Sequence, residues 1–451
     1  MTDESQLARF GLFDARVPRY TSYPTAPHFR PGFQAGTHAD WIGQVAPGSA
    51  ISLYLHVPFC RRLCWFCACR TQGTTSDAPV RAYVDTLLAE LELIGRALPS
   101  GVTLSRLHWG GGTPTLLPPD CIERLARAVT DIVPLAEDAE FSVEIDPNEI
   151  DDARLDALAA AGMNRASIGV QDFDPHIQKQ IGRDQSFEVT QSATNGLRAR
   201  GITSLNTDIL FGLPDQTTTR ITASVEKLLS LRPDRVALYG YAHVPWMARR
   251  QVMIPSDTLP RPEERLHLFE AARRLFVAAG YDEIGIDHFA LPGDGLAKAA
   301  KEGRLRRNFQ GYTDDTAQTL IGVGASAISR FPQGYSQNAP STSAHVKAIR
   351  GGGFSTARGY AFDGEDRLRA RMIEALMCDF RIDAAEMQDR FGLDAAAFAA
   401  KLAPTLSAFG EMVDLAPAGL TVPGFARPLT RMIARSLDTF EAPQSGHSPA
   451  I

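Results

Sequence analysis

The chain has 451 residues, a length that fits one large domain with a smaller one beside it. Hydrophobic residues make up 44% and charged residues 22%, which excludes a disordered or fibrous protein and is typical of a globular one. The formal net charge of −6 provides no general attraction for nucleic acid or anionic lipid, so composition favours neither as a partner.

The first residues contain neither the basic segment nor the apolar run of a signal peptide, and no apolar stretch approaches the ~20 residues that a membrane span requires. We therefore expect a cytoplasmic protein with no membrane partner. Thiols stay reduced in that compartment, so the six cysteines are not expected to form a disulfide framework. The clustered cysteines are instead candidate metal ligands.

From about residue 50, short apolar runs alternate with longer amphipathic ones, a pattern typical of strand–helix units around a parallel sheet. Between the first two strands, an apolar helical face is predicted from Val84, Leu87, Leu88, Leu91 and Ile94, and residues 263–279 have similar spacing. The predicted strands span 52–57, 104–109, 139–145, 165–170, 205–210 and 235–241. Six such units predict an α/β fold, an incomplete (β/α)6 barrel.

Residues 282–291 predict a further strand, and the Gly- and charge-containing stretch after it is interpreted as a long functional loop. After residues 351–353 the chain becomes helix-rich, from Asp366 to Gly410, and continues with a short hairpin pattern and a last helix. This order predicts a small, mostly helical, winged-helix-like domain. Such a shape serves in DNA binding as well as in structural caps, and fold does not fix function, so both interpretations stay open.

Four cysteines in residues 60–69 have the spacing CxxxCxxCxC and directly follow the first predicted strand. The loop therefore lies at the carboxyl end of a strand, where barrel enzymes build their active sites. Three thiolates on a short loop are able to hold three irons of a cubane cluster, leaving the fourth iron for a ligand other than protein. An open coordination position indicates chemistry.

A zinc site is the alternative interpretation of the same cysteines. Structural zinc usually takes its four ligands from two separated pairs, and the sequence has no second CxxC or HxxxH pair. Cys69 is nevertheless a fourth thiol that would complete a tetrahedron, so the number of cysteines leaves zinc open. Trp65 and Phe66 stand within the loop, either as core residues or to pack against a bound adenine.

Gly110, Gly111 and Gly112 follow the second strand in LHWGGGTPTLL. Glycines let the backbone approach a ligand closely and donate unhindered hydrogen bonds, although most glycine-rich turns are only turns. Adjacent parallel strands would place this turn and the cysteine loop on one rim. Polar residues follow or end the other strands and favour a binding site there as a set: Glu144, Asp146, Gln171, Asp172, Asp208, Tyr241 and His243.

With these motifs in place, the chain resembles the oxygen-independent coproporphyrinogen III oxidases of the radical S-adenosylmethionine superfamily across nearly its whole length. The matching stretches include PRYTSYPTA, YLHVPFC, LHWGGGTPT, SVEIDP, SIGVQDF, GRDQ, NTDILFGLP, YAHVP, GIDHFA, RNFQGYT and GASAIS. On this basis we divide the chain into an N-terminal segment that contributes to an active-site lid (1–50), a radical S-adenosylmethionine barrel (51–350) and a C-terminal helical domain (351–451).

The resemblance implies a 4Fe-4S cluster held by Cys60, Cys64 and Cys67, with Cys69 as a cysteine that is not a ligand. It also implies two S-adenosylmethionine molecules. One chelates the open iron, and the matching positions are Tyr54, Gly111, Glu144 and Ile328. The second is implied at Phe66, Gly112, Thr113, Gln171, Arg183, Asp208 and Ala242.

The reaction that the resemblance implies begins with electron transfer from the cluster to S-adenosylmethionine, giving methionine and a 5′-deoxyadenosyl radical. That radical removes hydrogen from a propionate side chain, and loss of carbon dioxide and an electron leaves a vinyl group. Two such steps convert coproporphyrinogen III into protoporphyrinogen IX, for haem biosynthesis. The electron donor and acceptor are not identified by the sequence, and we expect a monomer with no nucleic-acid partner.

Arg19 stands in the N-terminal PRYTSYPTA stretch, a stiff polar element that is our candidate lid and propionate contact, with a surface turn as the alternative. Two related functions compete with the oxidase. Haem chaperones of the superfamily lack both this stretch and the cysteine after the third ligand, and a haem-degrading methyltransferase would form a different product. The chain departs from the family pattern in reading CAC where CGC is expected, and in the non-basic end DTFEAPQSGHSPAI.

Overall fold

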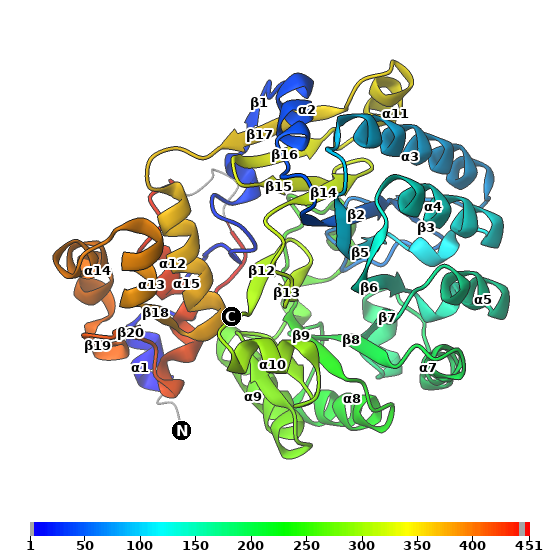
Figure 1. Ribbon diagram of the computed structural model, residues 1–451. Coiled ribbons are helices and arrows are strands. Elements are labelled where there is room, and N and C mark those ends of the chain that lie inside the picture. The colour runs from blue at the N-terminus through cyan, green and yellow to red at the C-terminus, as the bar shows by residue number, and fades with distance from the viewer. Residues whose placement is uncertain (1–3, 442–446) are drawn as a thin grey trace.

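Six parallel strands form the centre of the computed structural model, which describes residues 4–441 and 447–451 (Figure 1). Each pairs with the next along the chain in parallel register, so the predicted strands and the incomplete (β/α)6 barrel are confirmed. The strands are β2 (Ala50–Val57), β5 (Thr103–Gly111), β6 (Leu135–Ile145), β7 (Arg165–Gln171), β8 (Ser204–Phe211) and β9 (Arg235–Gly240).

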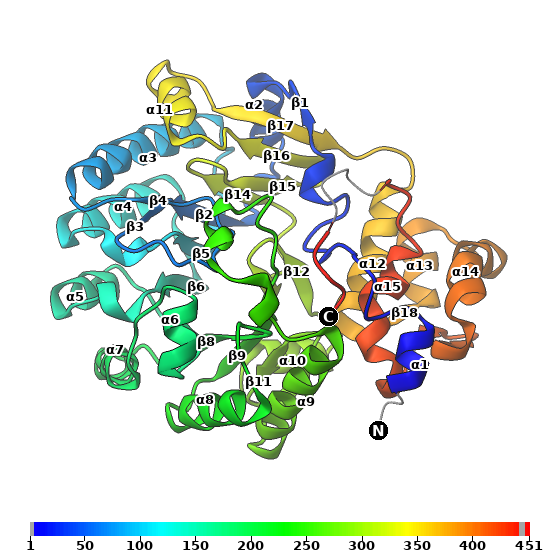
Figure 2. The same ribbon diagram turned by 180° about the vertical axis from the view of Figure 1, so that it is seen from behind.

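Helices cover the outer face of this sheet, as Figures 1 and 2 show from opposite sides. Their apolar faces pack on the strands; in the first of them Val84, Leu87, Leu91 and Ile94 are buried. Capping side chains begin several of them, because an Asp, Ser or Thr accepts from a free backbone N–H of the first turn. The helices are α3 (Ala78–Ala97), α4 (Pro119–Ile132), α5 (Asp152–Ala160), α6 (Pro175–Gln180), α7 (Phe187–Ala199), α8 (Thr218–Ser230) and α9 (Pro262–Ala278).

The sheet continues beyond β2 with strands that the sequence did not predict. β14 (Leu320–Val323) pairs parallel to β2, and four antiparallel strands follow it: β15 (Ile328–Phe331), β16 (Gly334–Asn338), β17 (Thr356–Ala361) and β1 (Arg30–Pro31). Every residue of β16 is buried although its sequence, GYSQN, is mostly polar. Strands this short and polar have no alternating apolar pattern, so only their hydrogen-bonded neighbours define them.

At the other edge the predicted strand at 282–291 is wrong, because it is a hairpin of two strands, β10 (Asp282–Ile284) and β11 (His288–Ala290). Gly285 turns the chain with a φ of +55°, and a Cβ there would lie 2.1 Å from the ring of Tyr312. The interpretation of the stretch that follows as a long functional loop is wrong in that the stretch has regular structure. It contains α10 (Gly295–Lys301), β12 (Arg306–Asn308) and β13 (Gly311–Thr313).

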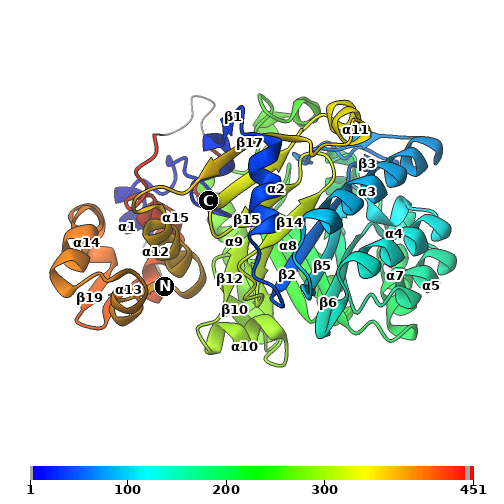
Figure 3. The same ribbon diagram turned by 45° about the horizontal axis from the view of Figure 1, so that its top comes forward.

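The C-terminal part is helix-rich and includes a small three-stranded sheet, as the winged-helix-like prediction required. Its order is α12 (Asp366–Asp379), β18 (Arg381–Asp383), α13 (Ala384–Phe391), α14 (Ala395–Phe409), β19 (Asp414–Ala416), β20 (Gly419–Thr421) and α15 (Thr430–Arg435). It stands beside the barrel, and the C-terminus of the chain lies between the two (Figure 3).

The N-terminal segment spans both parts of the molecule. Leu7, Leu12, Val17, Tyr20 and Tyr23 belong to the hydrophobic core of the C-terminal part, while β1 extends the barrel sheet. β17 continues that sheet past residue 350, so the barrel and the C-terminal domain share structure near the expected boundary. The division into three regions stays a prediction, and its stretch 442–446 and residues 1–3 lie outside the described residues.

The remaining elements are short. They are α1 (Glu4–Arg9), α2 (Ala35–Gly43), α11 (Thr342–Arg350), β3 (Phe59–Cys60), β4 (Gln72–Gly73) and 3-10 helices at Ala26–His28, Pro114–Leu116, Pro147–Glu149, Arg249–Met253, Ser256–Thr258, Gly410–Met412 and Gly424–Leu429. Within the described residues, none of the helices combines the length and apolar character needed to cross a membrane.

Candidate functional site

The cysteine loop leaves the carboxyl end of β2, the position that the sequence predicts. β3 pairs with β4 in parallel register, so the two ends of the loop are held together at Cys60 and Gly73. Cys60, Cys64 and Cys67 are partly buried free thiols, and Cys69 is exposed. Ala68, which replaces the glycine of the family pattern, is exposed as well, so its methyl group is accommodated.

The surroundings of these three thiols shift their pKa values in different directions. Burial raises the pKa of Cys60 to about 11. It also raises the pKa of Cys64, although the guanidinium of Arg183, 3.5 Å from the Cys64 Sγ, acts in the opposite direction. The pKa of Cys67 falls to about 6, because the thiol and the backbone N–H of Cys69 both donate to its sulfur. Cys69 is thus a hydrogen-bond donor to a neighbouring thiolate.

The glycine turn at the end of β5 lies directly against the cysteine loop. The N–H of Gly112 donates to the Val57 carbonyl, and the N–H of Thr113 donates to the Phe59 carbonyl, both at 2.8 Å. A Cβ on Gly112 would lie 2.5 Å from the Phe59 oxygen, and one on Gly110 would lie 2.6 Å from a Glu144 oxygen. Only glycine permits these backbones to approach so closely.

Glu144 at the end of β6 joins the turn to the interior of the barrel. One carboxylate oxygen accepts from the Gly111 N–H at 2.9 Å, and the other lies 3.3 Å from His108 Nε2. The imidazole of His108 is stacked on the ring of Tyr54, with centroids 5.6 Å apart, and the Tyr54 hydroxyl lies 3.0 Å from His56 Nδ1. The structure thereby brings Tyr54, Gly111 and Glu144 together, through histidines that sequence reasoning missed.

Arg183 connects the cysteine loop to the next strands of the rim. Besides Cys64, it contacts the Gly169 carbonyl at 2.9 Å and the Gln185 side chain at 3.0 Å. Gln171, two residues after Gly169 on β7, has a left-handed φ of 68°. Asp208 on β8 is registered opposite Gly169.

The pKa of Asp208 rises to about 7 because burial outweighs the hydrogen bond that the Asn206 amide donates at 2.9 Å. A carboxyl group with such a pKa is partly protonated near neutral pH, so Asp208 is able both to donate and to accept a hydrogen bond. Nearby Glu144 differs, since its pKa is lowered: His108 and the Gly111 N–H stabilise its charged form more than burial opposes it.

Two residues of the 3-10 helix Arg249–Met253 fix the far side of the cysteine loop, and the sequence provided no signal for them. Gln251 donates to the carbonyls of Phe66, at 2.7 Å, and Ala242, at 3.0 Å. Arg250 donates to the Thr71 hydroxyl at 2.7 Å. The loop is 180 residues away in sequence, so only the fold reveals these contacts.

The remaining predicted residues occupy three different places. Ile328 begins β15, where its carbonyl abuts Gly322, the residue registered opposite Tyr54. Trp65 lies on Gly182, at 2.9 Å from the position of a Cβ, and so serves the packing of the loop. Arg19 lies in a second, larger cavity between the barrel and the C-terminal part, and donates at 2.6 Å to the carbonyl of Gly240, at the carboxyl end of β9.

A polar cavity of about 250 Å³ occupies the interior of the barrel below the rim and is lined by Tyr54, His108, Glu144 and Asp208. Ion pairs close its amino-terminal end: Arg106 contacts Asp314 at 2.9 Å, and Arg235 contacts Asp294 at 2.6 Å. Within the described residues, no three His, Cys, Asp or Glu side chains converge closely enough to hold a single metal ion. The cysteines are thus arranged around a loop and do not converge on one point.

Comparison with known proteins agrees with this geometry. Residues 54–228 match the radical SAM superfamily. The oxygen-independent coproporphyrinogen III oxidase of Paracoccus denitrificans is 67% identical over the full length of both chains, and that of Escherichia coli is 38% identical over 96% of this chain and 95% of its own. The solved structure of coproporphyrinogen III oxidase from Escherichia coli, a radical SAM enzyme, superimposes with a TM-score of 0.88 at 36% identity, covering 95% of this chain and all of that one.

The chain belongs to the oxygen-independent coproporphyrinogen III oxidases. Membership of this radical SAM family implies a 4Fe-4S cluster and S-adenosylmethionine. The residues of this chain fit such groups, because three free thiols share one loop and the glycine turn leaves no room for a side chain beside it. Cysteine thiolates are the usual protein ligands of iron–sulfur clusters, and the Cys67 thiol has the lowered pKa that favours this form.

Proposed function

We propose that this chain converts coproporphyrinogen III into protoporphyrinogen IX by oxidative decarboxylation of two propionate side chains to vinyl groups, without oxygen. One observation carries the proposal. The cysteine loop, the Gly110–Gly112 turn and Glu144 are bonded into one rim at the carboxyl ends of the strands, in a chain related over its full length to oxidases of this name. Barrel enzymes place their chemistry at that rim.

In this proposal Cys60, Cys64 and Cys67 hold one 4Fe-4S cluster, and Cys69 stays outside the ligand set. When bound, the cluster and S-adenosylmethionine would supply the radical chemistry that removes hydrogen from the propionate. The hydrogen bonds from Cys69 to the Cys67 sulfur support the assignment of Cys69 as a supporting donor.

The first S-adenosylmethionine is assigned to Tyr54, Gly111, Glu144 and Ile328. Glu144 has a lowered pKa and is therefore ionised, so its carboxylate suits a cationic group of this molecule. The Gly111 N–H holds that carboxylate in place before anything binds, which reduces the cost of ordering it.

A second S-adenosylmethionine is assigned to Phe66, Gly112, Thr113, Gln171, Arg183, Asp208 and Ala242. These residues come from the cysteine loop, from β5, β7, β8 and β9 or the residues that follow them, and, for Arg183, from the segment between α6 and α7. The contacts of Arg183 and Gln251 support them as one surface. Arg183 provides a cation and Asp208 a carboxyl group, the two partners that a bound amino acid moiety requires.

A reactive alkyl radical must be kept from solvent, so the rim has to be covered during the reaction. The N-terminal segment supports this role, because it crosses from the C-terminal core to the barrel and places Arg19 against the Gly240 carbonyl. The protein's contribution is thus positioning and exclusion.

The test is anaerobic reconstitution of the full chain with iron and sulfide, followed by reduction in the presence of S-adenosylmethionine and coproporphyrinogen III. We expect 5′-deoxyadenosine and a divinyl product, measured by chromatography and mass spectrometry. Stoichiometric haem binding with unchanged coproporphyrinogen would replace the oxidase by a haem chaperone. Opening or methylation of haem would indicate the methyltransferase instead.

A further inference from the structure

A cavity of about 530 Å³ lies between the barrel and the C-terminal part, and its charge is unbalanced. Its volume is within the range of small-molecule sites. Seven arginines line it against three side-chain carboxylates and the terminal residue Ile451. They come from the N-terminal segment, the barrel and the C-terminal part: Arg19, Arg265, Arg273, Arg274, Arg307, Arg427 and Arg431.

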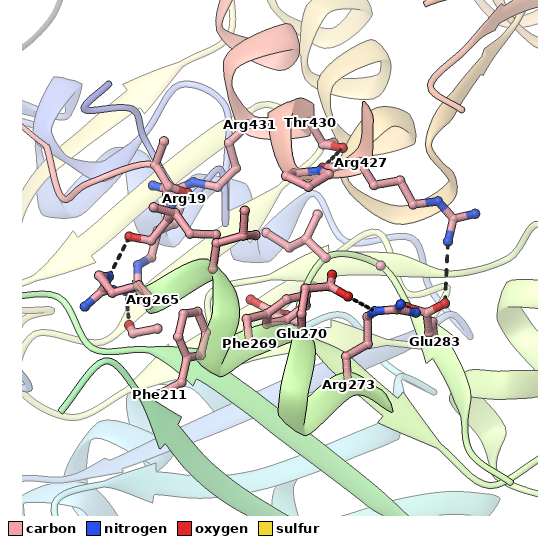
Figure 4. A pocket seen from close by; sticks show the side chains of 18 of the residues that line it. Arg19, Phe211, Arg265, Phe269, Glu270, Arg273, Glu283, Arg427, Thr430 and Arg431 are labelled. Carbon is pink, nitrogen blue, oxygen red and sulfur yellow. Dashed lines mark hydrogen bonds and ion pairs between the residues drawn. The ribbon is translucent and has the colours of Figure 1, made fainter. Parts of the chain in front are cut away.

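Two arginines on one side of this cavity are paired with carboxylates. Arg273 contacts Glu270 at 3.0 Å and Glu283 at 3.1 Å, and Arg427 lies 4.0 Å from Glu283. Figure 4 shows these four side chains together on one side of the cavity, with dashed lines between them. The third carboxylate, Asp287, lies 3.8 Å from Arg307 and also contacts His288.

The other half holds three arginines that contact no Asp or Glu side chain among the described residues. Arg19 donates to the Gly240 carbonyl, and Arg265 donates to the carbonyls of Gly212 and Tyr241 and, at 3.0 Å, to the terminal carboxylate of Ile451. Arg431 donates to the carbonyls of residues 17, 18, 449 and 450. These three side chains gather on the side of the cavity opposite the ion-paired half (Figure 4).

Burial and mutual repulsion disfavour the charge of these arginines. Burial and the neighbouring Arg19 lower the pKa of Arg265 to about 10, and burial with Arg19 and Arg307 lowers that of Arg431 to about 9. Both nevertheless remain protonated at neutral pH. Asp287 partly offsets these effects at Arg19 and Arg431, and the terminal carboxylate contacts Arg265. A guanidinium does not readily lose its proton, so a bound anion would compensate the positive charge that remains.

The position of the three arginines relates the cavity to the proposed reaction. Arg19 is bonded to Gly240, between Tyr239, which lines the interior of the barrel, and Ala242, which is assigned to the rim. Phe211, Gly240 and Tyr241 line the cavity at the carboxyl ends of β8 and β9. A ligand held there would have one end beside the arginines and the other beside the rim.

We propose that Arg19 and Arg265, with the buried charge of Arg431 beside them, form a carboxylate-binding site that holds propionate groups of the tetrapyrrole other than the one being decarboxylated. This inference rests on the proposed function. Guanidinium groups bind carboxylates through paired N–H donors, which gives both affinity and orientation. The same groups stay on substrate and product, so the site anchors the macrocycle while a reacting propionate is at the rim.

The test measures binding separately from catalysis. The reconstituted full chain is titrated anaerobically with coproporphyrin III, the stable oxidised analogue with four carboxylates, and with its uncharged tetramethyl ester, by fluorescence quenching. Arg19→Gln and Arg265→Gln are expected to weaken coproporphyrin binding by roughly tenfold or more, since each removes a charge-assisted hydrogen bond. Binding of the ester should change by less than about twofold.

Arg273→Gln is the matched control, because it removes an identical charge from the same cavity where carboxylates already balance it. We expect its coproporphyrin affinity to stay within about twofold of wild type. An equal loss in Arg273→Gln and Arg19→Gln, or an equal loss for acid and ester, would overturn the proposal.

Arg19→Gln decides the case if Arg265→Gln does not fold, since Arg19 has a single hydrogen-bonded partner, the Gly240 carbonyl. Arg19→Lys, which keeps the charge, should recover part of the affinity. If wild type turns over coproporphyrinogen and Arg19→Gln binds coproporphyrin III as tightly as wild type does, the site is rejected and the proposed function stands. Binding that depends on Arg19, in a wild-type protein without turnover, would reject the function and keep the site.

Discussion

The arginines at the floor of the barrel and those at the domain interface contact different groups. Arg165, Arg235 and Arg265 are 6%, 6% and 8% exposed, so all three are removed from water. Arg235 contacts Asp294 at 2.6 Å, and Arg165 lies 3.6 Å from Glu140, whereas Arg265 contacts two backbone carbonyls and the terminal carboxylate of Ile451, and no Asp or Glu side chain within the described chain. The arginines paired with Asp or Glu close the barrel, and those at the interface face the cavity.

Burial of a charge therefore has two outcomes in this molecule. At the floor of the barrel the buried charge is paired with a carboxylate of the protein itself. Such pairs contribute to the shape of the barrel more dependably than to its stability. At the interface the buried charge has no Asp or Glu partner and faces a cavity that an anion could occupy. The rim forms a third environment, in which each ionisable group is set by local donors, as the opposite pKa shifts of Glu144 and Asp208 illustrate.

The largest expected effect is at the cysteine loop. Cys64→Ala should lose the cluster and reduce 5′-deoxyadenosine formation to background, because two thiolates hold a 4Fe-4S cluster less strongly than three do. Iron content and product analysis measure this. Cys69→Ala is the control and should retain its iron. Coproporphyrin III affinity should be preserved in Cys64→Ala, and a loss there would show that the rim and the interface cavity are not separate sites.

Glu90 in the core tests how burial without a charged partner affects stability when the buried group, unlike an arginine, is able to neutralise itself by taking a proton. Glu90 is 1% exposed and accepts from the Gly324 N–H and the Asn338 amide, both at 2.7 Å. Burial raises its pKa to about 8, and burial lowers the pKa of His345, 3.4 Å away, to about 4, so both are neutral near pH 6.

The folded pKa of Glu90 exceeds its ordinary value of 4.5, so its protonated form stabilises the fold. That contribution is complete below about pH 4.5 and is lost as pH rises through 8. Below about pH 6.5 the lowered pKa of His345 has the opposite effect, so we expect the free energy of unfolding to decline between about pH 6.5 and 9. Glu90→Gln should lessen the decline by an amount on the order of a few kcal/mol. Urea unfolding at several pH values measures this, and equal slopes in both proteins would contradict it.

The close contact of the glycine turn provides a smaller effect on stability. Gly112→Ala places a methyl group 2.5 Å from the Phe59 oxygen, so the backbone must shift, at a cost of about 1 to 3 kcal/mol. Chemical denaturation measures the loss. Gly353→Ala is the control, since a Cβ there meets open space, and it should leave stability unchanged. A Gly112→Ala protein as stable as wild type would mean that the turn and the loop do not pack as described.

The smallest effect expected is at the carboxylate of the rim. Glu144→Gln keeps an oxygen for the Gly111 N–H but removes the charge, so S-adenosylmethionine should bind roughly tenfold more weakly. Calorimetry on the reconstituted protein measures the affinity. Coproporphyrin III binding should not change, because that affinity is assigned to the arginines. If Glu144→Gln weakened the binding of both S-adenosylmethionine and coproporphyrin III, the two cavities would have to be regarded as one site.

The sequence by itself determined the six parallel strands, the cysteine loop and the glycine turn, because each is written in consecutive residues. Strand–helix alternation, cysteine spacing and a run of glycines are local patterns, and the strand register then brings their carboxyl ends to one rim. The helical character of the C-terminal part was evident for the same reason. Specific roles at the rim came from family resemblance and stay predictions.

Tertiary structure alone decided the rest. The antiparallel extension of the sheet depends on polar strands whose hydrogen bonds go to distant partners, and the hairpin at Gly285 depends on the ring of Tyr312 above it. The arginine site joins residues 19, 265 and 431. Whether a buried arginine finds a carboxylate or only carbonyls is settled by packing between segments, and no local pattern in the chain records it.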